Sequence, residues 1–257
     1  WTAHNARPHE SLRPRLERWF WSAFTRRVDA VIHLSETGQR AVEAQHPVLA
    51  TRPHAIVPHG HLRDVYPDTV SREEARASLR IPESARVLAF FGMVRSYKNV
   101  PHLVRTFRAL PSGLGDVILL VAGAPRTPAL AEDVRAAAGG DPRVRLTLEH
   151  VPEQDVQRYL RAADLVVLPF TEVTNSGSAM LALSFDRRVL VPHRGTMGEL
   201  RETFGTDWVF TYEGDLTPDV LAGAIEWAVH RPSEAAPRLE ALEWQPIARQ
   251  TLSLYGG

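Results

Sequence analysis

From residue 87 onward, short and almost uninterrupted apolar runs alternate with segments that have the residue spacing of helices. Runs of Val, Leu and Ile without polar alternation are typical of strands buried on both faces of a parallel sheet. The predicted strands are residues 87–94, 117–123, 144–150, 164–170, 188–193 and 208–212. The predicted helices are residues 99–110, 129–138, 153–162, 177–185 and 218–230. This alternation predicts an α/β fold with a doubly wound sheet, whose strand-end loops share one edge.

The N-terminal residues have the same pattern in a shorter form. The predicted elements are a helix over 12–24, a strand over 28–34, a helix over 35–45 with Ser35 as its N-cap, and a strand over 55–57. So few strands do not make a stable doubly wound sheet, so we expect an incomplete domain whose earlier strands precede Trp1. Residues 58–71 have no periodicity and are predicted to be a linker. Pro246 is expected to kink or split a C-terminal helix over residues 239–255.

Composition excludes several classes of protein. Thirty basic residues balance thirty acidic ones, so charge gives no argument for nucleic-acid binding. Cysteine is absent, which excludes disulfides, zinc–thiolate sites and a cysteine nucleophile. No apolar run approaches the roughly 20 residues that span a bilayer, and the N-terminal residues do not resemble a signal peptide, so we expect a cytoplasmic protein.

The motifs of several enzyme classes are also absent. There is no His-Glu-x-x-His, no nucleophile-elbow serine, no Walker lysine and no Gly-x-Gly fingerprint. A metalloprotease, an α/β-hydrolase, a P-loop NTPase and a dehydrogenase are therefore disfavoured. We expect no cofactor and no protein-borne divalent metal site.

The loop after the first strong strand carries two cations. Lys98 is the single lysine among thirty basic residues, and Arg95 precedes it in the same loop. Gly92 at the strand end would let the backbone approach a ligand closely. Cations at the start of a helix suit a diphosphate, because the free N–H groups and the helix dipole also favour anions. The alternative is that both are solvated loop charges and that the arginine excess reflects genomic base composition.

A second loop of small residues follows the strand over 164–170. Asn175, Ser176, Gly177 and Ser178 open a helix, where exposed amides and hydroxyls would also bind phosphate. The alternative is a simple N-cap. Glu172, just before them, could accept hydrogen bonds from a ribose or sugar hydroxyl. Two such loops on one sheet edge favour a nucleotide ligand.

An aromatic cluster near the N-terminus allows two interpretations. Trp19, Phe20 and Trp21 are flanked by arginines, a pattern suited to peripheral contact with the inner face of a membrane. The favoured alternative is that this face packs against the absent strands. In the isolated chain the face would then be exposed, which predicts poor solubility or oligomerisation.

Several of these segments together resemble a known family. Residues 91–100 (FGMVRSYKNV) are similar to the Gly-x-(x)-Arg…Lys-(Gly/Asn) signature of family-four GT-B glycosyltransferases. In the same order as in that family, residues 56–60 resemble its V-I-P-N-G-V hinge, 121–125 its V-G-x-G-P, 162–169 its A-A-D-V-x-V-x-P-S and 189–192 its P-V-V-A. The resemblance implies two facing Rossmann-like domains: a partial acceptor-side domain (1–62), a nucleotide-sugar-binding domain (63–236) and a final helix crossing back to the first (237–257).

The same resemblance implies an activity. The chain is expected to move a sugar from a UDP- or GDP-type sugar nucleotide to a hydroxyl of a carbohydrate, lipid-linked or small-molecule acceptor, with retained anomeric configuration and without a metal. Arg95 and Lys98 would stabilise the departing diphosphate. His4 lies in a segment that resembles the family's x-x-His-(Asp/Asn) strand end, which faces the reaction centre, and is the candidate catalytic histidine.

One departure from the family keeps other functions open. Its Glu-x7-Glu pair corresponds here to Val173 and Leu181, so neither glutamate is present. This favours, as an alternative, a catalytically incomplete nucleotide-sugar-binding module or partner subunit. A third possibility is a GT-B sugar-nucleotide epimerase, which would form product without an acceptor.

Overall fold

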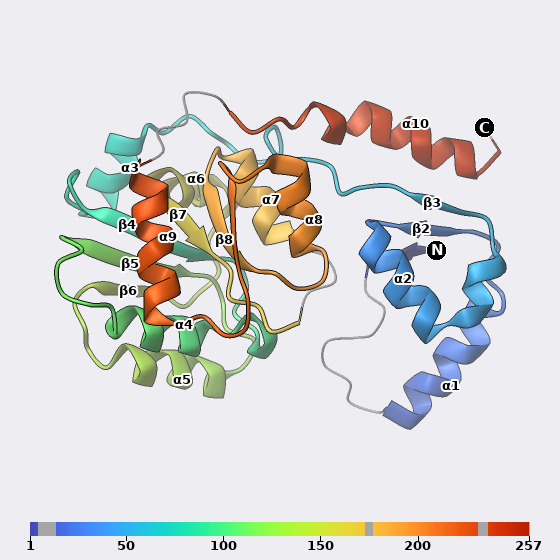
Figure 1. Ribbon diagram of the computed structural model, residues 1–257, viewed down its shortest axis with the longest axis horizontal. Coiled ribbons are helices and arrows are strands. Elements are labelled where there is room, and N and C mark those ends of the chain that lie inside the picture. The colour runs from blue at the N-terminus through green and yellow to red at the C-terminus, as the bar shows by residue number, and fades with distance from the viewer. Residues whose placement is uncertain (5–13, 173–176, 231–235, 257) are drawn as a thin grey trace.

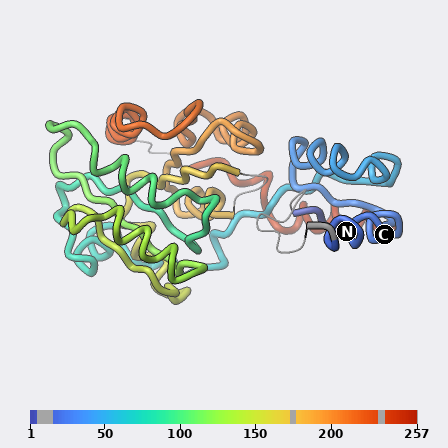
Figure 2. The backbone as a smooth tube through the Cα atoms, turned by 90° about the horizontal axis from the view of Figure 1, so that it is seen from below, coloured from blue at the N-terminus to red at the C-terminus, as the bar shows by residue number. Residues whose placement is uncertain are grey.

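The computed structural model describes residues 1–4, 14–172, 177–230 and 236–256. Two parallel sheets lie in separate lobes, a small N-terminal one and a larger second one (Figures 1 and 2). Strands β1–β3 fall within residues 1–62 and strands β4–β9 within residues 63–236. The segment after β3 and the segment before the last helix join the lobes.

The first lobe is a three-stranded parallel sheet of order β1-β2-β3. Its elements are β1 (Thr2–Ala3), α1 (Pro14–Thr25), β2 (Val31–His33), α2 (Glu36–Gln45), the 3₁₀ turn η1 (Pro47–Thr51) and β3 (His54–Ile56). The predicted N-cap is present: the Ser35 hydroxyl accepts from Gly38 N at 2.9 Å. A small apolar cluster that includes Val31, Val42 and Leu49 joins the sheet to its helices.

Helix α1 divides its aromatic residues between two directions. Trp21 and Phe24 pack on Trp1, with ring centroids 5.6 Å away in both cases. Trp19 and Phe20 stay 71 % and 54 % exposed. Trp21 of the predicted cluster therefore packs inside this chain, whereas Trp19 and Phe20 contribute to an exposed apolar surface.

The second lobe has six parallel strands in the order β6-β5-β4-β7-β8-β9. These are β4 (Arg86–Phe91), β5 (Val117–Ala122), β6 (Val144–Thr147), β7 (Leu165–Val167), β8 (Arg188–Pro192) and β9 (Val209–Tyr212). Numbered within the lobe, the order is 3-2-1-4-5-6, the order of the Rossmann fold. The direction of winding reverses between β4 and β7, and ligands of such sheets bind outside the carboxyl ends of the strands at that switch point.

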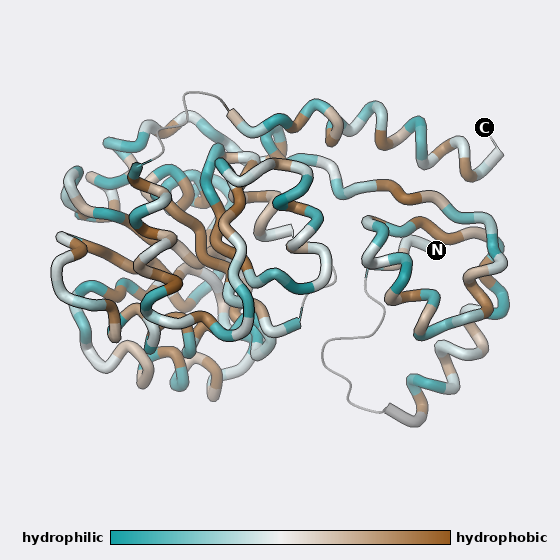
Figure 3. Tube along the Cα trace, viewed as in Figure 1, coloured by the Kyte–Doolittle hydropathy of each residue, from teal (hydrophilic) through white to brown (hydrophobic). Residues whose placement is uncertain are grey.

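Helices cover both faces of this sheet. They are α3 (Arg72–Ser78), the 3₁₀ turn η2 (Ser96–Lys98), α4 (Val100–Arg108), α5 (Pro128–Ala138), α6 (Glu153–Ala162), α7 (Gly177–Ser184), α8 (Met197–Phe204) and α9 (Pro218–His230). Helix α4 contacts α5 and α9, whereas α3 contacts α6 on the opposite face. The central strands between them are largely hydrophobic (Figure 3), and every residue of β5 is buried.

Two helices were absent from the sequence expectations. Helix α3 begins with a complete capping box, in which Ser71 and Glu74 satisfy each other's backbone amides. Its Ser-x-x-Glu signature was available in the sequence but lies in the expected linker region. Helix α8 is as short as α7, but half of its residues are polar or charged, so it lacks the apolar pattern that marked α7 in the sequence. Several strands are also shorter than their apolar runs, because the last residues of each run belong to the following loop.

The C-terminal helix returns to the first lobe. The prediction that Pro246 kinks or splits a helix over 239–255 is wrong: the segment is the 3₁₀ turn η3 (Glu240–Leu242) followed by the continuous helix α10 (Trp244–Leu254). Pro246 lies in the first turn of α10, where no intrahelical N–H is required. Gln250 Nε2 donates to Ile56 O at 2.7 Å, and Ile247 packs with Ile32 and Val57. Helix α10 thus covers one face of the small sheet, while α2 covers the other.

A close backbone approach joins the ends of β4 and β5, and it predicts a stability difference between two glycine variants. A Cβ on Gly123 would lie 2.2 Å from the Gly92 carbonyl oxygen, and φ of Gly123 is +143°. Gly113 has a comparable φ of +109° but no atom within 4 Å of that position. We expect G113A to lose about 1–3 kcal/mol from backbone strain alone. Urea denaturation of G123A should show a larger loss, and equal losses would contradict the steric argument.

Candidate functional site

The loop after β4 begins with a glycine in a conformation that other residues rarely adopt. Gly92 has φ +116°, and a Cβ there would lie 3.3 Å from Ser178 Oγ and 3.4 Å from Lys98 Nζ. Val94 is buried and pairs with Pro125 as an isolated bridge. The loop is therefore held down against the end of β5 before it turns into η2 and α4.

Lys98 is buried, with 8 % of its surface exposed. Its Nζ lies 5.8 Å from the Phe90 ring centroid and 5.4 Å from that of Phe170. Burial, and to a smaller extent the nearby charge of Arg95, together lower the pKa of Lys98 to about 8. A poorly solvated ammonium beside a second cation is stabilised by an anion, so this environment favours a negatively charged ligand. The solvated-charge interpretation is wrong for Lys98.

The second loop reaches the same place from the other side of the switch point. Lys98 Nζ donates to Ser178 Oγ at 3.4 Å, and Ser178 is the second residue of α7. Thr171 N donates to Tyr97 O at 2.8 Å, which ties the loop after β7 to η2. Two segments that are 80 residues apart in sequence thus meet at the carboxyl ends of β4 and β7.

The remaining predicted site residues lie in different surroundings. Arg95 is half-buried, and its Nε lies 3.3 Å from Met93 Sδ. Glu172 is exposed in the loop after β7, and His4 is exposed directly after β1 in the other lobe. Gly177 starts α7, whereas Asn175 and Ser176 lie outside the described residues. The structure therefore brings Gly92, Lys98 and Ser178 together.

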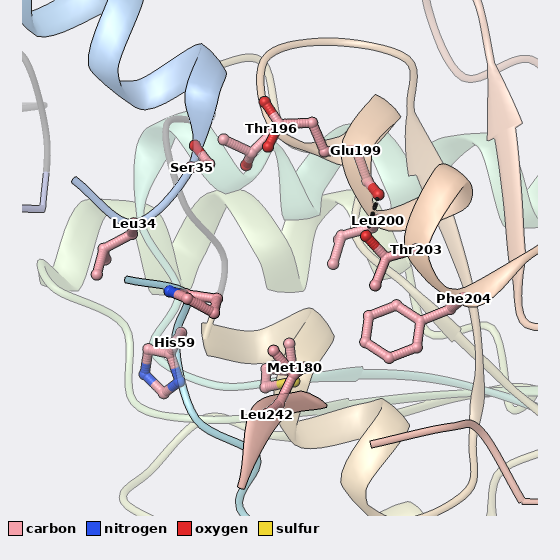
Figure 4. A pocket seen from close by; sticks show the side chains of 11 residues that line it. Leu34, Ser35, His59, Met180, Thr196, Glu199, Leu200, Thr203, Phe204 and Leu242 are labelled. Carbon is pink, nitrogen blue, oxygen red and sulfur yellow. Dashed lines mark hydrogen bonds between the residues drawn. The ribbon is translucent and has the colours of Figure 1, made fainter. Parts of the chain in front are cut away.

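A cavity of about 130 Å³ lies between the two lobes (Figure 4). Residues at the carboxyl ends of β2 and β3 line one wall, and residues of α7, α8 and η3 line the other. They are Leu34, Ser35, Pro58, His59, Met180, Thr196, Glu199, Leu200, Thr203, Phe204 and Leu242. A more polar cavity of about 480 Å³ adjoins it and shares Ser35 and Glu199.

The lobes also contact each other directly beside this cavity. Thr37 N at the start of α2 donates to Glu199 Oε1 at 2.7 Å. Sequence reasoning missed Glu199 because the short helix α8 was not expected. Ligand sites lie at the carboxyl ends of parallel strands. Applying this rule to β8 as well as to β4 and β7 would have pointed to the segment that contains Glu199.

The described residues contain no group of three or more His, Asp or Glu side chains that could hold a metal ion. Within the same residues, no helix is long and apolar enough to cross a bilayer.

Comparison with known proteins identifies the family. Residues 85–230 match the family model described as "Glycosyl transferases group 1". The chain belongs to this family. It is 32 % identical over 248 residues to the GDP-mannose:glycolipid 4-β-D-mannosyltransferase of Xanthomonas campestris, covering 96 % of this chain and 65 % of that protein. It is 26 % identical over 281 residues to the α-maltose-1-phosphate synthase of Mycolicibacterium smegmatis, covering 99 % and 71 %.

Solved structures show the same fold. HepE of Anabaena in complex with UDP-glucose matches with a TM-score of 0.77 at 15 % identity, over 100 % of this chain and 71 % of that one. Sucrose-phosphate synthase from Thermosynechococcus elongatus matches with a TM-score of 0.75 at 20 % identity, over 99 % and 66 %. The glycosyltransferase fold with paired Rossmann-like sheets, GT-B, is thereby confirmed. The chain spans 65 % of the length of the Xanthomonas relative.

The pKa of Lys98 predicts how anion binding depends on pH. Because the ammonium loses its proton near pH 8, nucleoside diphosphate affinity should fall from pH 7.5 to 9.5, by up to about tenfold per pH unit above the pKa. The unliganded chain should show the opposite trend: the unfolded lysine binds more protons between pH 8 and 10.5, so the Lys98 contribution to stability rises there.

Calorimetric titration at several pH values measures the affinity. K98R is the matched variant, because its guanidinium stays charged over the whole range. A nucleotide affinity that falls equally in K98R and in the unmodified chain would show that Lys98 is not the titrating group.

Proposed function

We propose that this chain carries the donor site and part of the acceptor side of a glycosyltransferase, which moves a sugar from a UDP- or GDP-type sugar nucleotide to an acceptor hydroxyl. The observation that carries the proposal is the buried ammonium of Lys98, 3.4 Å from Ser178 Oγ at the switch point. Family membership and the sugar nucleotides named for relatives support it.

In this proposal the role of each residue is assigned from the charge that develops on the leaving group. As the bond between the sugar and the diphosphate breaks, negative charge accumulates on the diphosphate oxygens, and fixed cations lower the energy of that state. Lys98 is the central group, Arg95 the second cation, and the Ser178 hydroxyl with the first amides of α7 the neutral donors. Gly92 leaves the space for the diphosphate, and Asn175, Ser176 and Gly177 would complete the loop around it.

The acceptor side is assigned to the first lobe. His4 follows β1, and the carboxyl ends of the small sheet face the second lobe across the cavity. We propose His4 as the acceptor-side histidine and Glu172 as a group that binds donor hydroxyls. The proposed acceptor is a carbohydrate, a lipid-linked or a small molecule, and the glycolipid in the name of the Xanthomonas relative supports the lipid-linked class.

Transfer with retained configuration and without a metal completes the proposal. The name of the Xanthomonas relative gives a β-mannoside as its product, so stereochemistry is a sharp test. With a donor of known α-configuration, an α-linked product in the NMR spectrum is the expected result. A β-linked product would replace retention with inversion while leaving the donor site in place.

A nucleotide-sugar-binding module without turnover is the second candidate. Leu181, at the position of the family's second glutamate, is buried on α7 and offers no acceptor for a ribose hydroxyl. Such a module would bind the donor and form no product with any acceptor. An epimerase would form product from the donor alone.

We further propose that more strands continue the first lobe at β1. In the described residues β1 pairs with β2 alone, and the exposed Leu16, Trp19 and Phe20 of α1 leave an apolar surface for such a continuation to cover. Light scattering of the isolated chain should then show oligomers. A stable monomer that binds anionic vesicles would instead favour contact of α1 with a membrane.

Calorimetric titration with UDP, GDP and ADP tests the donor site. We expect one nucleotide to bind, and R95A/K98A to lose at least about tenfold in affinity, since two charge-assisted contacts disappear. R105A is the matched control, because it removes an exposed arginine of α4 outside the loop. Equal affinity of the double variant and the control would remove the diphosphate from this loop.

A further inference from the structure

Among the residues that the structure describes, two chain segments and the hydrogen bond of Glu199 connect the lobes in different places. The segments run through residues 57–63 and 239–244 and pack on each other: Trp244 Nε1 donates to His61 O at 2.9 Å, and His61 N donates to Leu242 O at 3.0 Å. A Cβ on Gly60 would lie 2.6 Å from the Trp244 ring, so the two crossings are closely packed. The hydrogen bond between Thr37 N and Glu199 lies instead at the cavity wall.

Two backbone amides in the first turn of α2 donate hydrogen bonds to different lobes. Gly38 N donates to the N-cap Ser35 at 2.9 Å, within the first lobe. Thr37 N donates to Glu199 Oε1 of the second lobe at 2.7 Å. Helix α2 has ten residues, and a carboxylate at its N-terminus also interacts favourably with the helix dipole. The cap of α2 is therefore complete only when the second lobe is in place.

The position of Glu199 is itself fixed. It is the third residue of α8, and its carbonyl accepts from Thr203 Oγ1 at 2.8 Å. The His193 ring packs against the same turn: a Cβ on Gly198 would lie 3.1 Å from its Nε2. A carboxylate on a packed helical turn directly after β8 links the carboxyl edge of the large sheet to that of the small one.

We infer that Glu199 is an interlobe positioning residue, which holds the start of α2 and the acceptor-side strand ends at a fixed distance from the donor loops. Its role in catalysis rests on the proposed function; its role in lobe arrangement does not. With Glu199 engaged, the lobes keep the separation of this structure. Without it, they are connected by the two packed crossings and open more widely.

A distance measurement between the lobes tests the inference directly. The chain has no cysteine, so A44C on α2 and A136C on α5 provide two unique sites for spin labels on exposed helical positions. Loss of a charge-assisted hydrogen bond in E199A should shift the ratio of the longer-distance to the shorter-distance population by at least about tenfold. E199Q keeps an acceptor oxygen for Thr37 N and should restore most of the short-distance population.

E202A is the matched control, since it removes a carboxylate one turn along α8 and should leave the distances unchanged. Thermal denaturation of each variant checks that the lobes remain folded. Identical distance distributions in E199A and the unmodified chain would overturn the inference, and so would an equal change in E202A.

A kinetic readout separates this inference from the proposed function. In E199A we expect nucleotide affinity to stay unchanged, because the donor loops lie within one lobe, while kcat falls or the acceptor KM rises. A chain that forms no glycosyl product but shows the E199A distance change would contradict the proposed function and leave the positioning role intact. A loss of nucleotide affinity in E199A would show that Glu199 acts on the donor loops, and would overturn the inference that it acts only on the arrangement of the lobes.

Discussion

At the switch point of the large sheet, the carboxyl ends of two adjacent strands point the same way while their helices leave toward opposite faces. In sheets with this strand order, ligands bind in the crevice that forms at such a point between the loops, here those that follow β4 and β7. Gly92 approaches Gly123 closely and has no side chain. The side chains of Lys98 and Ser178 can therefore meet beside its backbone. The burial of this cation depends on this arrangement of the backbone, and so does the anion site that we propose around it.

Burial gives Lys98 a property that an exposed lysine would not have. Phe90 and Phe170 replace much of its water, and Arg95 adds a like charge, so its pKa falls to about 8. The free chain holds an ammonium that is poorly stabilised by its own surroundings. In the proposed donor site, a bound diphosphate would place negative charge beside this ammonium and stabilise it.

The two lobes contribute unequally to this chemistry. The large lobe has an extended core with both sheet faces covered, and it carries the loops that we propose bind the donor. The small lobe has three short strands, and its helix α2 obtains one of its capping bonds from Glu199 of the large lobe. The stability of α2 therefore depends on the position of the large lobe. In the proposed function, such a dependence would help to align donor and acceptor.

The sequence alone determined the class of fold and much of its order. Buried parallel strands need continuous apolar runs, so these strands were recognisable, and helices α6 and α9 have the predicted bounds because strong patterns delimit them. The loops proposed to bind an anion were inferred in the same way, from the ends of predicted strands and from single residues such as Lys98. Helices α3 and α8 are short and rich in polar residues, so they gave no apolar periodicity, and Glu199 was missed with α8. The tertiary structure decided that Lys98 is buried, that Ser178 lies beside it and that Glu199 spans the lobes, because each depends on segments far apart in sequence meeting in space.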